Sequence, residues 1–208
     1  MLDSKTSNPD LWSDDRWFVY LLAASDCSAF KVGFTCNPLQ RFYSFSHRYF
    51  EHFDLAASRL LRVDTNLDAR ELELAIKQGL AAYRCDCPSW VLPQAGGDTE
   101  WFSPIYLSNA EAQLRSHAAS PNAADIIIVE DFLREALERA STYFESWALA
   151  QAHSILRRRT PREQALIATE VRVLRDWLDA YRALNVEIFT DNPEARVLLA
   201  RITTTASL

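Results

Sequence analysis

The sequence contains few glycines and no long run of apolar residues. Only 4 glycines accompany 8 prolines and 11 phenylalanines, and this composition excludes collagen-like and intrinsically disordered chains. The longest apolar run near the start, from Trp17 to Ala24, is far shorter than the roughly 20 residues that a membrane helix needs. We therefore expect a globular, cytoplasmic protein that has no membrane as a partner.

Cysteine is scarce as well, with 4 residues in the chain. No secretion signal precedes them, so the sequence favours free thiols over a disulfide framework. Cys85 and Cys87 are separated by a single residue, whereas paired zinc ligands usually have two or more residues between them. No pair of histidines follows, and the sequence therefore predicts no zinc site at these cysteines.

Positive charge is in deficit over the whole chain. The 22 Lys and Arg residues stand against 28 Asp and Glu residues, which gives a net charge of -6. This balance is unfavourable for nucleic-acid binding, because affinity for phosphates comes mainly from lysine and arginine. The sign reverses between residues 31 and 62, where five basic residues stand against two acidic ones, a local balance of +3. The predicted nucleic-acid-binding set is Lys31, Arg41, Arg48, Arg59 and Arg62.

Strand and helix patterns alternate in the first half of the sequence. Aromatic and branched residues predict two antiparallel strands joined by a polar turn. Asn37 and Pro38 then mark a helix start, because asparagine caps free backbone amides and proline suits the first helical position. The expected elements are strands at 17–24, 30–34 and 55–63, helices at 38–49 and about 66–84, a strand at 101–107 that Pro104 marks as an edge strand, and a helix at 108–117.

Only helical patterns occur in the second half. Apolar residues at three- and four-residue spacings predict one helix at 125–156, a second at 161–184 and a third from Pro193. Small and polar residues from Ala118 to Ala124 mark a linker. The predicted fold class is therefore α+β: residues 1–16 form a flexible lead-in, residues 17–118 a small antiparallel sheet flanked by helices, and residues 119–208 an all-α domain.

The start of the long predicted helix is more apolar than one helix face requires. Ile126, Ile127 and Ile128 stand directly before Val129. Such a run indicates contact with the first domain or with a second chain, although ordinary core packing explains it as well. The helical half is accordingly a candidate surface for a protein partner or a homodimer.

Two triplets on the predicted strands stand out together with the motif that follows them. Phe18-Val19-Tyr20 and Lys31-Val32-Gly33 are separated by ten residues, and the second continues as Phe34-Thr35-Cys36-Asn37-Pro38-Leu39-Gln40-Arg41. This arrangement resembles the GIY-YIG nuclease family, above all its phage-type branch, in which the second triplet begins with lysine. Later motifs of that branch match Leu72-Glu73, Arg84 and Glu100-Trp101-Phe102, so the resemblance extends from about Trp17 to Asn109.

The resemblance implies a metal-dependent endonuclease that cuts DNA phosphodiester bonds. Glu73 would hold a divalent metal, Mg²⁺ or Mn²⁺, because hard cations prefer oxygen ligands. Arg41 would bind the phosphate through two hydrogen bonds. Tyr20 would hold or deprotonate the attacking water, provided that Lys31 or another nearby cation stabilises its anion. His47 is a second candidate base, since its unperturbed pKa is better suited to the task.

Each of these residues also has a structural interpretation. Tyr20 can equally be explained as a half-buried strand residue without a catalytic role. Glu73 can be explained as a carboxylate near a helix start, and His47 as a surface residue. Glu100 is expected to be structural, through Arg84 or a backbone amide. The alternative function is an inactive GIY-YIG-fold binding protein, a regulator or an immunity-type protein, whose acidic helical half binds a basic partner.

Overall fold

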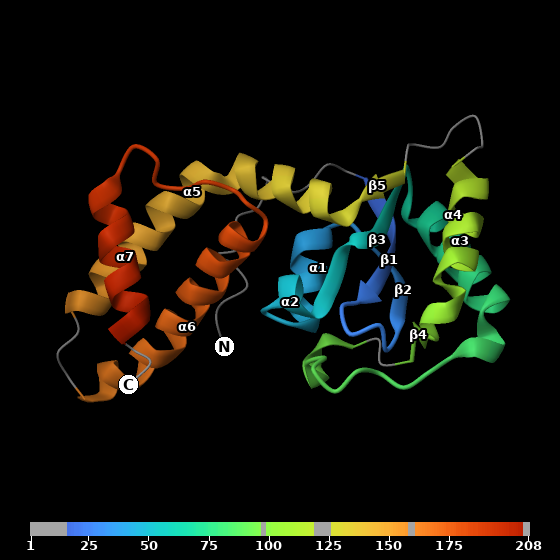
Figure 1. Ribbon diagram of the computed structural model, residues 1–208, viewed down its shortest axis with the longest axis horizontal. Coiled ribbons are helices and arrows are strands. Elements are labelled where there is room, and N and C mark those ends of the chain that lie inside the picture. The colour runs from blue at the N-terminus through green and yellow to red at the C-terminus, as the bar shows by residue number, and fades with distance from the viewer. Residues whose placement is uncertain (1–15, 97–98, 119–125, 158–160, 206–208) are drawn as a thin grey trace. The chain divides into compact units, whose positions relative to one another are not determined.

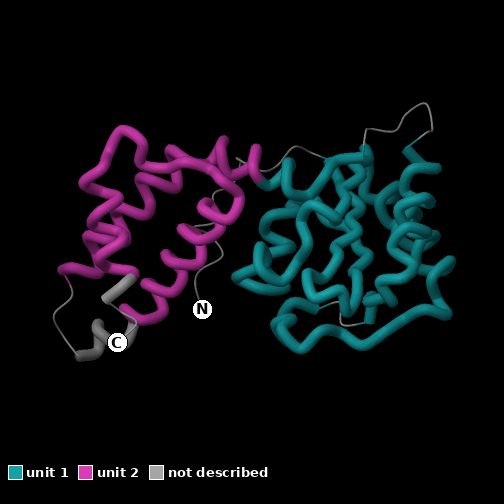
Figure 2. Tube along the Cα trace, viewed as in Figure 1, with its two compact units in different colours: residues 1–133 teal, residues 134–208 magenta. Residues whose placement is uncertain are grey.

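A computed structural model of the chain describes residues 16–96, 99–118, 126–157 and 161–205 (Figure 1). Its contacts divide the chain into two compact units, Met1–Leu133 and Arg134–Leu208 (Figure 2). The predicted lead-in and the predicted linker lie outside the described residues, apart from Arg16 and Ala118 at their ends. Among the described residues, no helix is both long enough and apolar enough to cross a membrane.

The first unit is built on a five-stranded antiparallel sheet, and the predicted α+β class is confirmed. The strand order is β4-β2-β1-β3-β5. The elements of this unit are β1 (Trp17–Ala24), β2 (Phe30–Thr35), α1 (Pro38–Phe45), α2 (Tyr49–His52), β3 (Phe53–Val63), α3 (Asn66–Gly79), β4 (Trp101–Phe102), α4 (Leu107–Ala118), β5 (Ile126–Ile128) and the start of α5 (Val129–Arg157).

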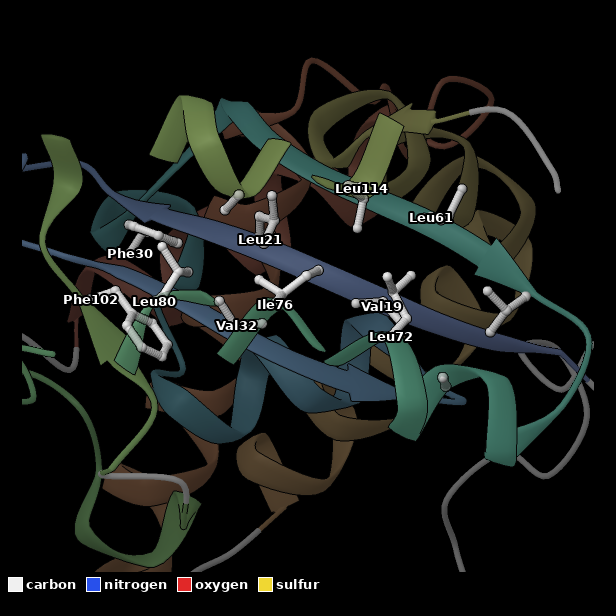
Figure 3. Packing of buried hydrophobic residues seen from close by; sticks show 13 residues of the cluster. Val19, Leu21, Phe30, Val32, Leu61, Leu72, Ile76, Leu80, Phe102 and Leu114 are labelled. Carbon is white, nitrogen blue, oxygen red and sulfur yellow. The ribbon is translucent and has the colours of Figure 1, made fainter. Parts of the chain in front are cut away.

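Helices cover both faces of the sheet, which explains the unbroken apolar run of β1. This central strand is buried from Phe18 to Ala24 on both faces. Helices α3 and α4 pack on one face, where Leu72, Ile76 and Leu114 meet the apolar side chains of β1, β2 and β3 (Figure 3). Helices α1 and α2 lie on the opposite face (Figure 1). An alternating pattern is absent from β1 because neither of its faces is exposed to water.

The helix predicted at 38–49 is wrong in its length, because it breaks into α1 and α2. Ser46 adopts an extended conformation at the end of α1, with φ -153° and ψ 136°. Its hydroxyl accepts a hydrogen bond from the backbone N–H of Arg48 at 3.1 Å. A serine side chain that offers this alternative partner competes with the helical hydrogen bond, and the chain turns before Tyr49 begins the next helix.

Two further predicted elements end earlier than expected. Helix α3 stops at Gly79 and continues only as a 3₁₀ turn at Ala81–Tyr83, since glycine is a poor helix former. The strand predicted at 101–107 is limited to Trp101–Phe102, because Pro104 begins a 3₁₀ helix instead. Strand β4 is nevertheless at an edge of the sheet, as predicted.

The helix predicted from residue 125 is wrong in its first turn. Ile126–Ile128 form strand β5, which pairs with β3 so that Ile127 lies opposite Leu60. Three consecutive β-branched residues favour this extended conformation. The apolar run therefore joins the sheet of the first unit, and α5 begins only at Val129.

Three helices form the second unit: the larger part of α5, α6 (Pro161–Ala183) and α7 (Pro193–Thr205). Phe144 of α5 stacks on Tyr181 of α6 with 4.5 Å between ring centroids. The segment between α6 and α7 is anchored by Glu145, whose Oε1 accepts a hydrogen bond from the Phe189 N–H at 2.5 Å. One face of α5 is buried, at Ala136, Ala140, Phe144, Ala148, Ala152 and Ile155.

Gly33 has a steric role in the sheet. It lies opposite Tyr20 in the pairing of β1 with β2. A Cβ atom at this position would lie 2.2 Å from the Tyr20 hydroxyl oxygen and 2.4 Å from its Cζ. The phenol ring is held in place by edge-to-face contacts with Phe42 and Phe45 of α1. Glycine is therefore required so that Tyr20 can lie across β2.

We expect Gly33→Ala to lower the free energy of unfolding by about 1–3 kcal/mol, as overpacking of a core does. Gly79→Ala is the matched control. A Cβ at Gly79 would meet only the amide end of Gln113 at 3.0 Å, and alanine favours the helix, so a change below about 1 kcal/mol is expected. Urea unfolding of both variants measures the difference. Equal stability of the two variants would contradict the steric role of Gly33.

Candidate active site

The motif between β2 and α1 fixes the position of Arg41. Thr35 Oγ1 accepts a hydrogen bond from the Asn37 N–H at 3.0 Å, and Asn37 Oδ1 accepts one from the Gln40 N–H at 3.0 Å. Pro38 occupies the first helical position, where it needs no hydrogen-bond partner for its nitrogen. This local capping starts α1 at a defined residue and directs Arg41 toward β1.

Four contacts hold the guanidinium group of Arg41. Its Nε donates to the Tyr20 hydroxyl at 3.3 Å, and its Nη1 donates to the Ala95 carbonyl at 2.7 Å and to Ser44 Oγ at 3.4 Å. The group also lies 4.3 Å from the centre of the Phe45 ring. Within the described part of the chain, Nη2 makes no hydrogen bond. Arg41 is thus oriented by the protein, and the donors on Nη2 remain available to an anion.

Tyr20 is almost completely buried, with 1% of its surface exposed. Burial raises the pKa of its hydroxyl to about 12, although the nearby Arg41 acts in the opposite direction. The phenol is therefore neutral at physiological pH. It accepts a hydrogen bond from the Nε of Arg41.

A chain of ion pairs connects β2 with α3. The ammonium of Lys31 donates to Glu100 Oε2 at 2.8 Å. The other oxygen of Glu100 accepts from Lys77 Nζ at 2.7 Å, and Lys77 Nζ also lies 3.2 Å from Glu73 Oε2. Glu100 comes from the segment just before β4, so three separate parts of the sequence meet here.

Burial and charge act against each other within this chain of ion pairs. Burial raises the pKa of Glu73, and Lys77 offsets the change only in part. Burial also opposes ionisation of Glu100, but its hydrogen bonds from Lys31 and Lys77 prevail and lower its pKa. Burial lowers the pKa of Lys31 despite the hydrogen bond to Glu100. Glu73 is thus the carboxylate that the lysines stabilise less well.

Glu73 fits a hard cation that keeps most of its water. Its side chain is 12% exposed, and within the described residues Oε1 has no hydrogen-bond partner. Mg²⁺ is commonly bound by one or two carboxylates together with waters and phosphate oxygens. The described residues contain no cluster of three or more His, Cys, Asp or Glu side chains for a metal. Any metal here would therefore be held by Glu73 with water and substrate.

The remaining predicted site residues do not join this group. The ring of His47 stacks on Tyr43 with 4.6 Å between centroids. Arg48 forms an ion pair with Glu51 of α2. The pairing of β1 with β3 places Arg62 opposite Phe18. Tyr20, Lys31, Arg41 and Glu73 are the predicted residues that interact electrostatically with one another.

Arg59 also lies away from the ion-pair chain. It pairs with Glu111 of α4 at 3.1 Å, on the face of the sheet opposite α1. Arg62 is three positions later on the same strand, and side chains alternate between the two faces of a strand. The five basic residues of the predicted set are therefore not gathered on one surface.

Two residues of the site escaped prediction in their present role. The sequence suggested Arg84 or a backbone amide as the partner of Glu100. In the structure, Glu100 binds Lys31 and Lys77 instead. Lys77 follows Glu73 by four residues, a spacing at which side chains meet on a helix, so this contact was detectable. The contacts of Glu100 were not, because its partners lie 69 and 23 residues away.

We expect Tyr20 to give no phenolate signal near pH 10, where an ordinary tyrosine is half ionised. Subtracting the ultraviolet titration of Tyr20→Phe from that of the wild type isolates this residue. Because its folded pKa is raised to about 12, its contribution to stability is complete below pH 10 and is lost as the pH rises toward 12. A difference transition centred at or below pH 10 would show that Tyr20 is not buried as described.

One protein-family model matches the part of the chain that forms the sheet and contains all the site residues. Residues 17–118, just under half of the chain, match the family model of the T5orf172 domain. No curated protein and no solved structure matches the chain. The T5orf172 domain is associated with the GIY-YIG, phage-type endonuclease-like fold, and no model specific to the GIY-YIG family matches. Tyr20, Lys31, Arg41, Glu73 and Glu100 all lie within the matched segment.

Proposed function

We propose that the chain is a metal-dependent endonuclease that hydrolyses DNA phosphodiester bonds at the site around Arg41 and Glu73. The match to the T5orf172 domain is consistent with a nuclease-like or DNA-binding function. The observation that carries the proposal is the arrangement of Arg41. Its guanidinium is fixed on one side by Tyr20 and the Ala95 carbonyl, while Nη2 remains available. An oriented arginine with donors available on Nη2 is well suited to hydrogen-bond a phosphate oxygen.

Arg41 would neutralise charge on the phosphate as the reaction proceeds. A fixed guanidinium needs little reorganisation when charge develops, and that is the main source of electrostatic catalysis. Tyr20 would act through Arg41, because its buried hydroxyl accepts the Nε hydrogen bond. Lys31, Arg41 and Lys77 against Glu73 and Glu100 leave the immediate site with a charge of +1, which also favours an anionic substrate.

Glu73 would hold a divalent cation, Mg²⁺ or Mn²⁺. Such an ion supplies an acidified water molecule and neutralises phosphate oxygens. Lys77 must then move away from Glu73, and it can do so because Glu100 is a second carboxylate partner for its ammonium. The distance from Lys77 Nζ to Glu100 is 2.7 Å, against 3.2 Å to Glu73. Lys77 can thus remain paired with Glu100 while Glu73 binds the cation.

We expect the wild-type protein to cut plasmid DNA in the presence of Mg²⁺ or Mn²⁺, and Glu73→Gln and Arg41→Ala each to lower the rate by roughly 100-fold or more. Glu71→Gln and Arg70→Ala are matched controls, because both residues are exposed on α3. Gel electrophoresis of the products measures the rates. The proposal fails if the wild type does not cut with either metal, or if the controls lose as much activity as the site variants.

We expect Lys77→Met to tighten Mn²⁺ binding roughly 3- to 10-fold, because it removes a cation that competes for Glu73. Glu100 keeps Lys31 as a partner in this variant. The signal of free Mn²⁺ in electron paramagnetic resonance measures the binding without any substrate. Arg70→Met, which removes a positive charge from the exposed face of α3, should leave the affinity unchanged. Weaker binding by Lys77→Met would count against Glu73 as the ligand.

One observation favours the alternative, a domain of this fold that binds without cutting. Lys77 already pairs with Glu73, with 3.2 Å between its Nζ and Glu73 Oε2, so the carboxylate has a cation without any metal. The plasmid assay decides between the two functions. Residues 119–208, the helical half of this alternative, carry 11 basic and 13 acidic residues, a balance of -2, so the expected acidic character is weak.

A further inference from the structure

The second unit contains an open pocket between α6, α7 and the segment that joins them. Its volume is about 710 Å³, which is in the range of ligand-binding clefts. The side chains of Leu178, Tyr181, Val186 and Phe189 contribute apolar surface. The joining segment is held in a defined shape, because Phe189 is 2% exposed and its N–H is bonded to Glu145.

Three arginines line this pocket. Arg175 donates to the Thr203 carbonyl and so joins α6 to α7. Arg196 of α7 donates to the carbonyls of Ile188 and Phe189, both at 3.3 Å. The side chain of Arg182 is 80% exposed. Two of the three guanidinium groups are thus oriented by main-chain carbonyls, and the third stands at the rim.

A second open pocket, of about 310 Å³, continues along the same helix. It is lined by Arg172 and shares Arg175 with the first pocket. At about 100° and 1.5 Å per residue, Arg172, Arg175 and Arg182 lie within about 80° of the circumference of α6 and over about 15 Å of its length. The arginines therefore form a row along two hollows that share Arg175.

Carboxylates reduce the positive charge of this row without reversing it. Asp179 pairs with Arg182 at 2.8 Å, and Glu187 is the other acidic residue that lines the pockets. Four arginines against two carboxylates leave a balance of +2. This concentration of charge contrasts with residues 1–133, where 11 basic residues stand against 18 acidic ones.

We propose that the row Arg172, Arg175, Arg182 and Arg196 binds the phosphodiester backbone of a nucleic-acid strand. A strand of duplex DNA presents one phosphate per about 3.4 Å of helix axis, so the row is long enough for several phosphates. Two hollows that share one arginine suit a ligand with repeated anionic groups better than a single small anion. This inference rests on the proposed function and deepens it, because the helical unit then holds the DNA that the first unit cuts.

The test measures binding of a labelled 20-nucleotide single strand and of its duplex by fluorescence anisotropy, using the full chain with Glu73→Gln to prevent cutting. Arg172→Gln/Arg182→Gln removes two exposed arginines of the row. We expect at least a tenfold weaker affinity at about 0.1 M salt and a salt dependence that is reduced by about 2 in slope. Loss of affinity for either form of DNA supports the inference.

Arg139→Gln/Arg157→Gln is the matched control. Both residues are exposed on α5 and line neither pocket, so the same loss of charge should change the affinity by less than about twofold. Circular dichroism confirms that each double variant is folded. The inference is overturned if the two double variants bind equally, or if the full chain binds neither form of DNA.

Failure of the inference can be told apart from failure of the proposed function. If the wild type cuts plasmid DNA and its binding does not depend on Arg172 and Arg182, the nuclease function stands and DNA binding by the arginine row is wrong. If binding depends on Arg172 and Arg182 but the protein does not cut, DNA binding by the arginine row stands and the nuclease function is wrong. The two measurements use separate variants, so each result is assigned to one unit.

Discussion

The buried ammonium of Lys31 needs a negative partner. Glu100 is that partner, and its contacts join β2, β4 and α3. Lys31 is 0% exposed, and an unpaired charge in such a place is unfavourable by several kcal/mol. Glu100 provides the partner from 69 residues later in the chain. The backbone acts at the same point, because Lys31 lies opposite Trp101 in the pairing of β2 with β4. The ion pair thus stabilises an edge strand of only two residues.

The same carboxylate also positions α3. The second oxygen of Glu100 binds Lys77, and Lys77 in turn reaches Glu73. Helix α3 packs on one face of the sheet, whereas Arg41 comes from α1 on the other face. Lys31 is one of only three lysines in the sequence, and Lys77 is another. Their placement at this one site brings the carboxylate of α3 into electrostatic contact with Tyr20 and Lys31.

Local chemistry made the sheet and the first half of the site predictable. Asn37 caps α1 through its side-chain oxygen, and Pro38 occupies the first helical position. Both residues mark the helix start in the sequence, so the position of Arg41 on the helix could be predicted. Ile126–Ile128 were misassigned because a short apolar run fits a buried strand and a buried helix equally well. Their strand depends on pairing with Leu60 and its neighbours, more than sixty residues earlier. The partners of Glu100 were hidden for the same reason.

The neutral Tyr20 limits how water can be activated in the proposed reaction. In the surroundings that the protein itself provides, the pKa of the Tyr20 hydroxyl is raised to about 12, and the phenol is protonated at physiological pH. Positive charge offers another route, since a nearby cation stabilises hydroxide relative to water. Arg41 and a cation on Glu73 would supply that charge, and Tyr20 would contribute by fixing the Arg41 guanidinium. The rate should then follow the ionisation of water in the site and not that of tyrosine.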